Sequence, residues 1–205
     1  MPNVSDVKSK FFGAVDALDA DGISVAASIG SATTLTLGGA LTSGGSYTSG
    51  DNIGQLVTIL SAGDDSGITF TVVGTDAVGD AQTEVVTGAN AGTATSSGYF
   101  NTVTSITTSA ASAGDVSAGV TGTGTGTVFA GRTRIRGLQG LSGTAAGNLL
   151  FKNTSVTGTT LLTVPTQAAA ELIEPYIPDN GVLFDAGAYV NFGSAVATVT
   201  VFYDG

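Results

Sequence analysis

The residues best suited to hold a metal ion are pairs of aspartates in glycine-rich stretches. The pairs are Asp19 with Asp21, Asp64 with Asp65, and Asp76 with Asp80. Carboxylate oxygens are the usual protein ligands of Ca²⁺, but no pair has the spacing of an EF-hand or of a calcium-binding glycine repeat. Asp and Gly are also ordinary turn residues, because Asp bonds its own backbone and Gly adopts positive φ. We therefore predict turns and no cofactor, and keep Asp64, Asp65, Asp76 and Asp80 as the candidates for a calcium site.

Three arginines, Arg132, Arg134 and Arg136, recur at a period of two. In a β-strand this spacing places their guanidinium groups on one face, with Thr133 and Ile135 on the other. Two interpretations stay open. The arginines pair with acids of the same chain, each exposed pair contributing ~0 to 1 kcal/mol. Alternatively, they bind the carboxylates of a partner, which would relieve their mutual repulsion through bidentate hydrogen bonds.

The composition excludes most catalytic machinery. The chain has no His, no Cys and no Trp. A Ser-His-Asp triad, a cysteine nucleophile, a zinc site built on thiolate or imidazole, and a disulfide are therefore impossible. A carboxylate pair for glycoside hydrolysis would also need a cleft with aromatic platforms for the sugar. We predict that the protein is not an enzyme.

The charge balance bears on partners and location. The formal net charge is -10, and charged residues make up only 11% of the chain, against about 25% in typical domains. A strongly acidic surface repels phosphate backbones and anionic lipid headgroups, so we expect neither nucleic acid nor a membrane as partner. The first residues lack the apolar run of an export signal, which predicts assembly in a cytoplasm.

One segment has the spacing of a helix, with Ser5 available as its cap. Its apolar residues recur at intervals of three and four within residues 4–18. They are Val4, Val7, Phe11, Val15 and Leu18. This stripe is expected to pack on its own domain or to dock as an arm on a neighbouring subunit. Phe11 and Phe12 are accordingly candidates for partner contact, after the three arginines.

The rest of the chain has the period of strands. Short β-branched and aromatic runs alternate with Gly, Asn, Asp and Ser, which predicts an all-β protein of two small antiparallel β-sandwich or jelly-roll-like units after the helix. The run Gly122–Gly126 has no side chain large enough to pack and predicts a linker or a domain boundary. The expected domains are residues 1–21 (helix or arm), 22–126 (acidic unit) and 127–205 (C-terminal unit). The predicted strands are 34–37, 56–60, 68–73, 83–87, 103–108, 115–120, 132–138, 148–152, 159–164, 172–177, 181–184, 188–192 and 196–203.

Two long runs carry a resemblance to a known group of proteins. Ala62–Ile106, which begins A-G-D-D-S-G-I-T-F-T-V-V-G, resembles a β module of virion structural proteins of tailed phages, notably marine ones. Pro175–Phe192, P-Y-I-P-D-N-G-V-L-F-D-A-G-A-Y-V-N-F, and the closing V-T-V-F-Y are similar to the terminal β unit of such particle proteins. The resemblance covers roughly half of the chain, carries no catalytic residue, and implies a component of a phage particle.

These expectations combine into one hypothesis. The protein is expected to be a non-enzymatic virion component that decorates or cements the outside of the head. Its partners would be the major capsid protein or another virion protein, and it would self-associate, for example as a trimer. Many weak contacts repeated over a lattice give avidity without catalytic groups. The alternatives are a neck, collar, tail or fibre component, or a calcium-dependent adhesin for the host surface.

Overall fold

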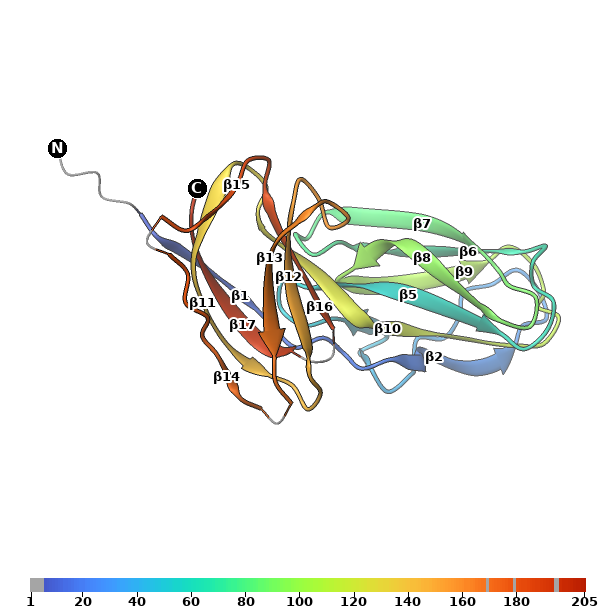
Figure 1. Cartoon of the computed structure of the whole chain (residues 1–205). Coiled ribbons are helices and arrows are strands. Elements are labelled where there is room, and N and C mark those ends of the chain that lie inside the picture. The colour runs from blue at the N-terminus through green and yellow to red at the C-terminus, as the bar shows by residue number, and fades with distance from the viewer. Residues whose placement is uncertain (1–5, 169, 179, 194–195) are drawn as a thin grey trace. The chain divides into compact units, whose positions relative to one another are not determined.

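The structure is a computed structural model that describes residues 6–168, 170–178, 180–193 and 196–205 (Figure 1). Within these residues every helix-or-strand element is a β-strand. The strand pairs with a defined register run antiparallel. The prediction of an all-β chain built from antiparallel sheets is therefore confirmed.

The prediction of an N-terminal helix is wrong, because this segment forms a strand. Lys8–Phe12 is β1, and it pairs antiparallel with the last strand, β17 (Val196–Asp204). The ladder satisfies backbone groups of both strands, which an isolated short helix does not achieve as well. Leu18, which the helix would have kept in its apolar stripe, is 74% exposed. Val4 and Ser5 lie outside the described residues.

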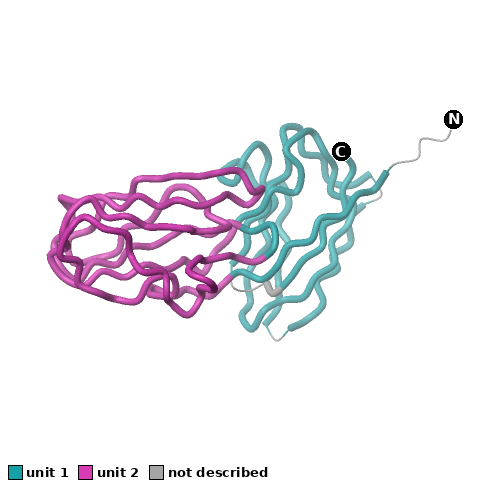
Figure 2. The backbone as a smooth tube through the Cα atoms, turned by 180° about the vertical axis from the view of Figure 1, so that it is seen from behind, with its two compact units in different colours: residues 1–15, 51–53, 125–205 teal, residues 16–50, 54–124 magenta. Residues whose placement is uncertain are grey.

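The chain divides into two compact units (Figure 2). Unit 1 contains residues 1–15, 51–53 and 125–205, and unit 2 contains residues 16–50 and 54–124. The chain thus starts in unit 1, builds unit 2, and returns. Residues 8–12 are a strand of unit 1 and not a separate arm, which differs from the predicted division at residue 21.

The glycine-threonine run is part of a strand and not a linker, although the division between the two units falls inside it, between Gly124 and Thr125. It lies inside β10 (Asp115–Phe129), the longest strand of the described chain. The β-branched threonines favour extended backbone, and the glycines permit close packing. A Cβ at Gly126 would lie 2.4 Å from the Phe12 ring, and one at Gly119 would lie 1.7 Å from the Asp19 carbonyl oxygen. Close contacts therefore require glycine at these two positions. The sequence does not reveal this requirement, because the contacts are made by residues far away in the chain.

Unit 2 contains two groups of paired strands. In the first, β10 pairs with β2 (Asp19–Ser28) and neighbours β5 (Gly54–Ser61), which pairs with β8 (Thr93–Phe100). The second has the order β3 (Thr42–Ser43), β4 (Ser46–Thr48), β9 (Thr102–Thr108), β6 (Thr69–Thr75) and β7 (Ala81–Thr87). Both groups contribute to one hydrophobic core that includes Ile59, Phe70, Val72, Phe100 and Ile106.

Unit 1 has a similar plan. One sheet has the order β1, β17, β11 (Thr133–Ser142), β14 (Leu172–Ile173), and β15 (Val182–Phe184) also pairs with β11. The other strands are β13 (Thr160–Thr166), β12 (Gly147–Asn153) and β16 (Ala188–Gly193), which neighbours the end of β10. The shared core includes Phe12, Ile135, Phe151, Val190 and Val201.

A buried polar network holds unit 2 where the chain enters and leaves it. Gln55 is fully buried. Its Nε2 donates to the carbonyl oxygens of Asp16 (3.1 Å) and Thr121 (2.6 Å), and its Oε1 accepts from the Asp16 amide (3.0 Å). The hydroxyls of Tyr47 and Ser49 also lie within hydrogen-bond distance of Oε1, at 3.0 and 3.1 Å. Burial raises the pKa of Tyr47 well above its usual range, so its hydroxyl keeps its proton and remains a donor.

Phe12→Ala tests the strand assignment of the N-terminal segment. Phe12 is fully buried and its ring lies 5.6 Å from that of Phe192, so its truncation should lower the free energy of unfolding by about 3–5 kcal/mol. Phe11→Ala is the matched control, with an expected loss of about 1 kcal/mol or less, because Phe11 is 43% exposed. Urea denaturation measures both, and a larger loss for Phe11→Ala would contradict the register of β1.

Gln55→Ala tests the polar network. The change leaves buried donors and acceptors on several backbone and hydroxyl groups without a partner, so the free energy of unfolding should fall by about 2–4 kcal/mol. Gln139→Ala, which changes an exposed glutamine, should stay within about 0.5 kcal/mol of the parent. Equal thermal stability of the two variants would show that the network contributes little.

Candidate partner-binding surface

The side of the sheet β1–β17–β11–β14 that faces away from the unit 1 core is here called the outer face. Cross-strand register places three rows of side chains on it: Phe11, Thr200 and Gln139; Ser9, Phe202 and Gly137; and Thr198, Leu141 and Leu172. Directly paired residues share a face. Their strand neighbours Phe12, Val199, Val201 and Leu138 point the other way and are buried.

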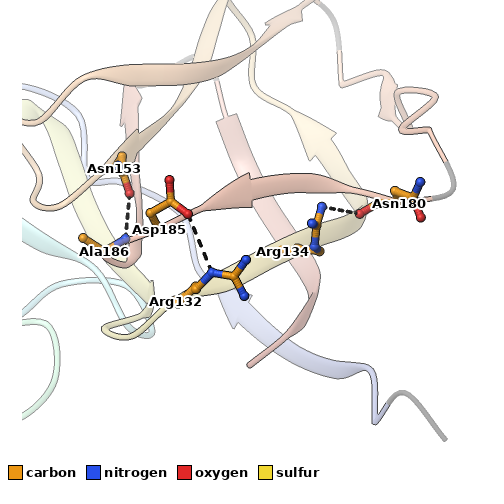
Figure 3. Close-up of polar contacts among 6 residues, drawn as sticks. All are labelled: Arg132, Arg134, Asn153, Asn180, Asp185 and Ala186. Carbon is orange, nitrogen blue, oxygen red and sulfur yellow. Dashed lines mark hydrogen bonds and ion pairs between the residues drawn. The ribbon is translucent and has the colours of Figure 1, made fainter. Parts of the chain in front are cut away.

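The arginines are arranged on β11 largely as their spacing predicts. Thr133 and Ile135 are buried, whereas Arg134 and Arg136 lie on the outer face. A register shift between Ile135 and Gly137 marks a β-bulge at Arg136. Arg132 precedes the strand and is exposed (Figure 3). Two of the three guanidinium groups therefore lie on the sheet, and the third lies at its edge.

Each arginine has an acceptor within the chain. Arg132 Nε lies 3.6 Å from Asp185 Oδ1, and Arg134 Nη1 donates to the Asn180 carbonyl oxygen at 3.0 Å (Figure 3). Arg136 Nε lies 3.5 Å from Asp204 Oδ2.

These partners explain how three like charges lie close together without a partner protein. The Arg132–Asp185 pair is about two-thirds exposed on both sides, so it contributes ~0 to 1 kcal/mol. An ion pair this weak exchanges readily for a carboxylate of another protein. The geometry is consistent with both interpretations of the arginines, and intramolecular pairing alone already accounts for it.

Phe11 and Phe12 are separated by the strand. Phe11 is half-exposed on the outer face, whereas Phe12 is fully buried in the unit 1 core. Neighbouring strand residues point to opposite faces, so only one of the two is available to a partner. Phe12 is therefore removed from the candidate contact residues, and Phe11 remains.

Several outer-face residues were not found from the sequence. Leu141, Leu172 and Tyr176 are 42%, 63% and 87% exposed. Leu141 and Leu138 are three apart and face opposite ways, while Ile135 and Leu138, also three apart, are both buried. The bulge at Arg136 shifts the alternation of buried and exposed residues by one position. No residue type in the sequence indicates this bulge.

A groove opens on the outer face beside β11. Residues 136–139 of β11 lie between the residues that pair with β15 and those that pair with β14. The connection from β14 to β15, residues 174–181, is longer than this four-residue interval. Pro175 and Pro178 lack the amide hydrogen that a ladder needs, so this segment leaves the sheet. The resulting groove has a volume of about 610 Å³, and its lining includes Arg136, Glu174, Tyr176 and Phe202.

Of the aspartates predicted to form turns, Asp64 and Asp76 do so, whereas Asp19 and Asp21 lie in β2, where Asp19 Oδ1 accepts from the Asp21 amide at 3.2 Å. Asp64 Oδ1 accepts from the amide and hydroxyl of Ser66, and these bonds lower the pKa of Asp64. Asp76 Oδ1 accepts from the amides of Val78 and Asp80 in the β6–β7 hairpin. Buried Asp65 accepts from the Ala113 amide at 2.7 Å.

These bonds engage one oxygen, Oδ1, of each of Asp64, Asp65 and Asp76. In the described part of the chain, no three His, Cys, Asp or Glu side chains come together as a metal site. The calcium candidates therefore rest on their sequence alone.

Comparisons with family models, curated proteins and solved structures found no match. Among the residues that the structure describes, no helix is long and apolar enough to span a membrane. The outer face must therefore be interpreted from its own chemistry.

The double change Arg134→Ser and Arg136→Ser tests whether these arginines matter to the fold. Both carry partly exposed interactions, so the free energy of unfolding should fall by about 1 kcal/mol or less. Ile135→Ser, between them in the sequence, should cost about 3–5 kcal/mol because it removes a fully buried side chain and buries a hydroxyl. Failure of the arginine variant to fold, measured by circular dichroism, would assign these residues a structural role.

Proposed function

We propose that this protein is a non-enzymatic structural component of a bacteriophage particle, which decorates the outside of the head by binding the major capsid protein or another virion protein. The observation that carries the proposal is the outer face. It combines half-exposed Phe11 with exposed Leu141 and Leu172 and with Arg134 and Arg136, and Arg132 forms an exposed ion pair at its edge. Exposed aromatic, aliphatic and arginine side chains are typical anchors of protein interfaces.

The resemblance of Ala62–Ile106 and Pro175–Phe192 to virion proteins supports the same proposal. The all-β architecture suits a coat component, because it requires no reactive group and buries two cores within 205 residues. The side chains that two groups of strands share in each core support the description of each unit as a small β-sandwich. The protein would assemble in the host cytoplasm and remain on the particle surface.

Binding to a lattice would account for weak individual contacts. A protein that binds only the mature shell stabilises it by mass action, and contacts among neighbouring copies add avidity. Self-association, for example as a trimer, belongs to this proposal. A neck, collar, tail or fibre component is the rival within the same class, and the number of copies per particle separates the two.

The calcium-dependent adhesin is the rival from another class. It requires free carboxylates at Asp64, Asp65, Asp76 or Asp80. Asp64 and Asp76 each use Oδ1 for two hydrogen bonds within their own turns, and no three acidic side chains of the described chain come together as a metal site, so we favour the decoration role. A chelator that lowers the melting temperature would favour the adhesin.

The triple change of Arg132, Arg134 and Arg136 to Ser tests the proposal. The variant should remain folded and lose co-sedimentation with heads built from the cognate capsid protein, because the carboxylates of the partner would lose their bidentate donors. Lys152→Ser is the matched control, since it removes a cation from β12, outside the outer face, and should leave co-sedimentation unchanged. Undiminished binding of the triple variant would contradict the assigned surface.

A further inference from the structure

The second half of β2 is an open sheet edge. β2 pairs with β10 on one side, and on its other side the amides of Gly39 and Leu41 donate to the carbonyl oxygens of Ile23 and Gly22. Beyond Ile23 this cover ends: no strand of the described chain pairs with the outer edge of residues 25–28. All four residues, V-A-A-S, are exposed. An exposed edge with unpaired backbone groups is a template for another strand.

A cavity adjoins this edge. It has a volume of about 230 Å³ and lies between β2 and the segment 33–36. That segment is tied to β9 through an isolated bridge between Thr34 and Thr107. Val25, Ile29, Leu35 and Val116 contribute apolar side chains to a lining that also contains serines and threonines, and no charged residue lines it. An uncharged side chain of an added strand could therefore enter this space beside the backbone ladder.

The charge of unit 2 identifies the kind of strand that fits. Residues 16–50 and 54–124 contain nine carboxylates and no Lys or Arg, whereas unit 1 contains seven carboxylates and all six cations. Two of these carboxylates, both exposed, lie near the edge: Asp21 precedes the covered residues of β2, and Asp115 lies on β10 in register with Ser28. Two copies of unit 2, each with a formal charge of -9, would repel each other.

We propose that the edge of β2 at residues 25–28 binds an extended segment of a partner protein, with a short apolar core and a Lys or Arg at each end, by β-strand addition. Main-chain hydrogen bonds to β2 supply affinity, an apolar side chain fills the cavity, and the carboxylates of unit 2 attract the terminal cations. This surface belongs to unit 2. It is therefore independent of the outer face of unit 1 and of the proposed place on a phage head.

The test uses the full chain and a capped peptide, Lys-Val-Thr-Val-Thr-Val-Lys, labelled for fluorescence anisotropy. We expect a Kd on the order of 100 μM at low salt. Methylating alternate amide nitrogens on the edge-facing side of the peptide should weaken binding about tenfold, since each lost backbone bond leaves an acceptor unpaired. Replacing both Lys by Glu should weaken it at least as much, because the carboxylates then repel. Hydrogen exchange should show new protection at residues 25–28.

Ala26→Lys and Ala81→Lys form a matched pair of variants. Both add one cation to an exposed alanine of unit 2, but only Ala26→Lys lies on the proposed edge, where Lys acts as a blocking residue. We expect about tenfold weaker peptide binding for Ala26→Lys and little change for Ala81→Lys, because a Lys on an edge strand blocks pairing with another strand. Equal loss in both would mean that net charge alone drives binding and would overturn the site.

Three further results would overturn the proposal. They are no binding at millimolar peptide, protection on β7 instead of residues 25–28, and a dimer of the free protein that Ala26→Lys abolishes, which would make a second copy the occupant. If Ala26→Lys fails to fold, the binding of methylated and unmethylated peptide to the unmodified protein still decides the test. Failure here would leave co-sedimentation through the outer face unaffected, so the two proposals are tested separately.

Discussion

The outer face depends on the pairing of the first strand with the last. β1 and β17 join residues 8–12 to residues 199–203, and the Lys8 ammonium donates to the carbonyl oxygen of Gly205 at 2.5 Å. This ladder places β17 between β1 and β11, which brings Phe11, Phe202 and Gly137 into adjacent rows. Closing so long a loop costs conformational entropy before any contact forms, so the core residues Phe12, Val199 and Val201 must offset that cost.

Small residues allow the backbones to approach, and few charges oppose the packing. Gly119 and Gly126 lie where a Cβ would collide with neighbouring backbone or with Phe12. Hydrogen bonding of buried polar groups then completes the structure, as the five groups around the side chain of Gln55 illustrate. The side chain of Gln55 thus satisfies backbone groups of Asp16 and Thr121 inside unit 2.

The alternation of apolar and polar residues along the chain predicted much of the fold. The predicted strands 68–73 and 83–87 correspond to β6 and β7, Phe70 and Val72 of β6 are buried, and Thr133 and Ile135 lie opposite Arg134 and Arg136. The misassigned segments have physical reasons. In residues 8–12 the apolar spacing fitted a helix, but a distant partner strand decided the outcome. In Gly122–Gly126 the lack of large side chains predicts a linker or boundary, but the run continues β10, and the Phe12 ring leaves no room for a Cβ at Gly126.

The candidate surface was only partly predictable for the same reason. Arg134, Arg136 and Phe11 were found because their residue types and spacing are local signals. Leu141 and Tyr176 were missed, since a bulge and a segment held off the sheet by two prolines decide their exposure. The open edge of β2 has no sequence signal either, because residues 25–28 look like any buried run of small residues until the strand order is known.

The central claim is that the outer face of unit 1 binds the shell of a phage head. Electron cryomicroscopy of intact particles would test it most directly. The account predicts density for this protein at equivalent positions over the head, with Phe11, Leu141 and the arginines of β11 against the shell. Particles that lack the protein, or that hold it with this face turned to solvent, would contradict the claim.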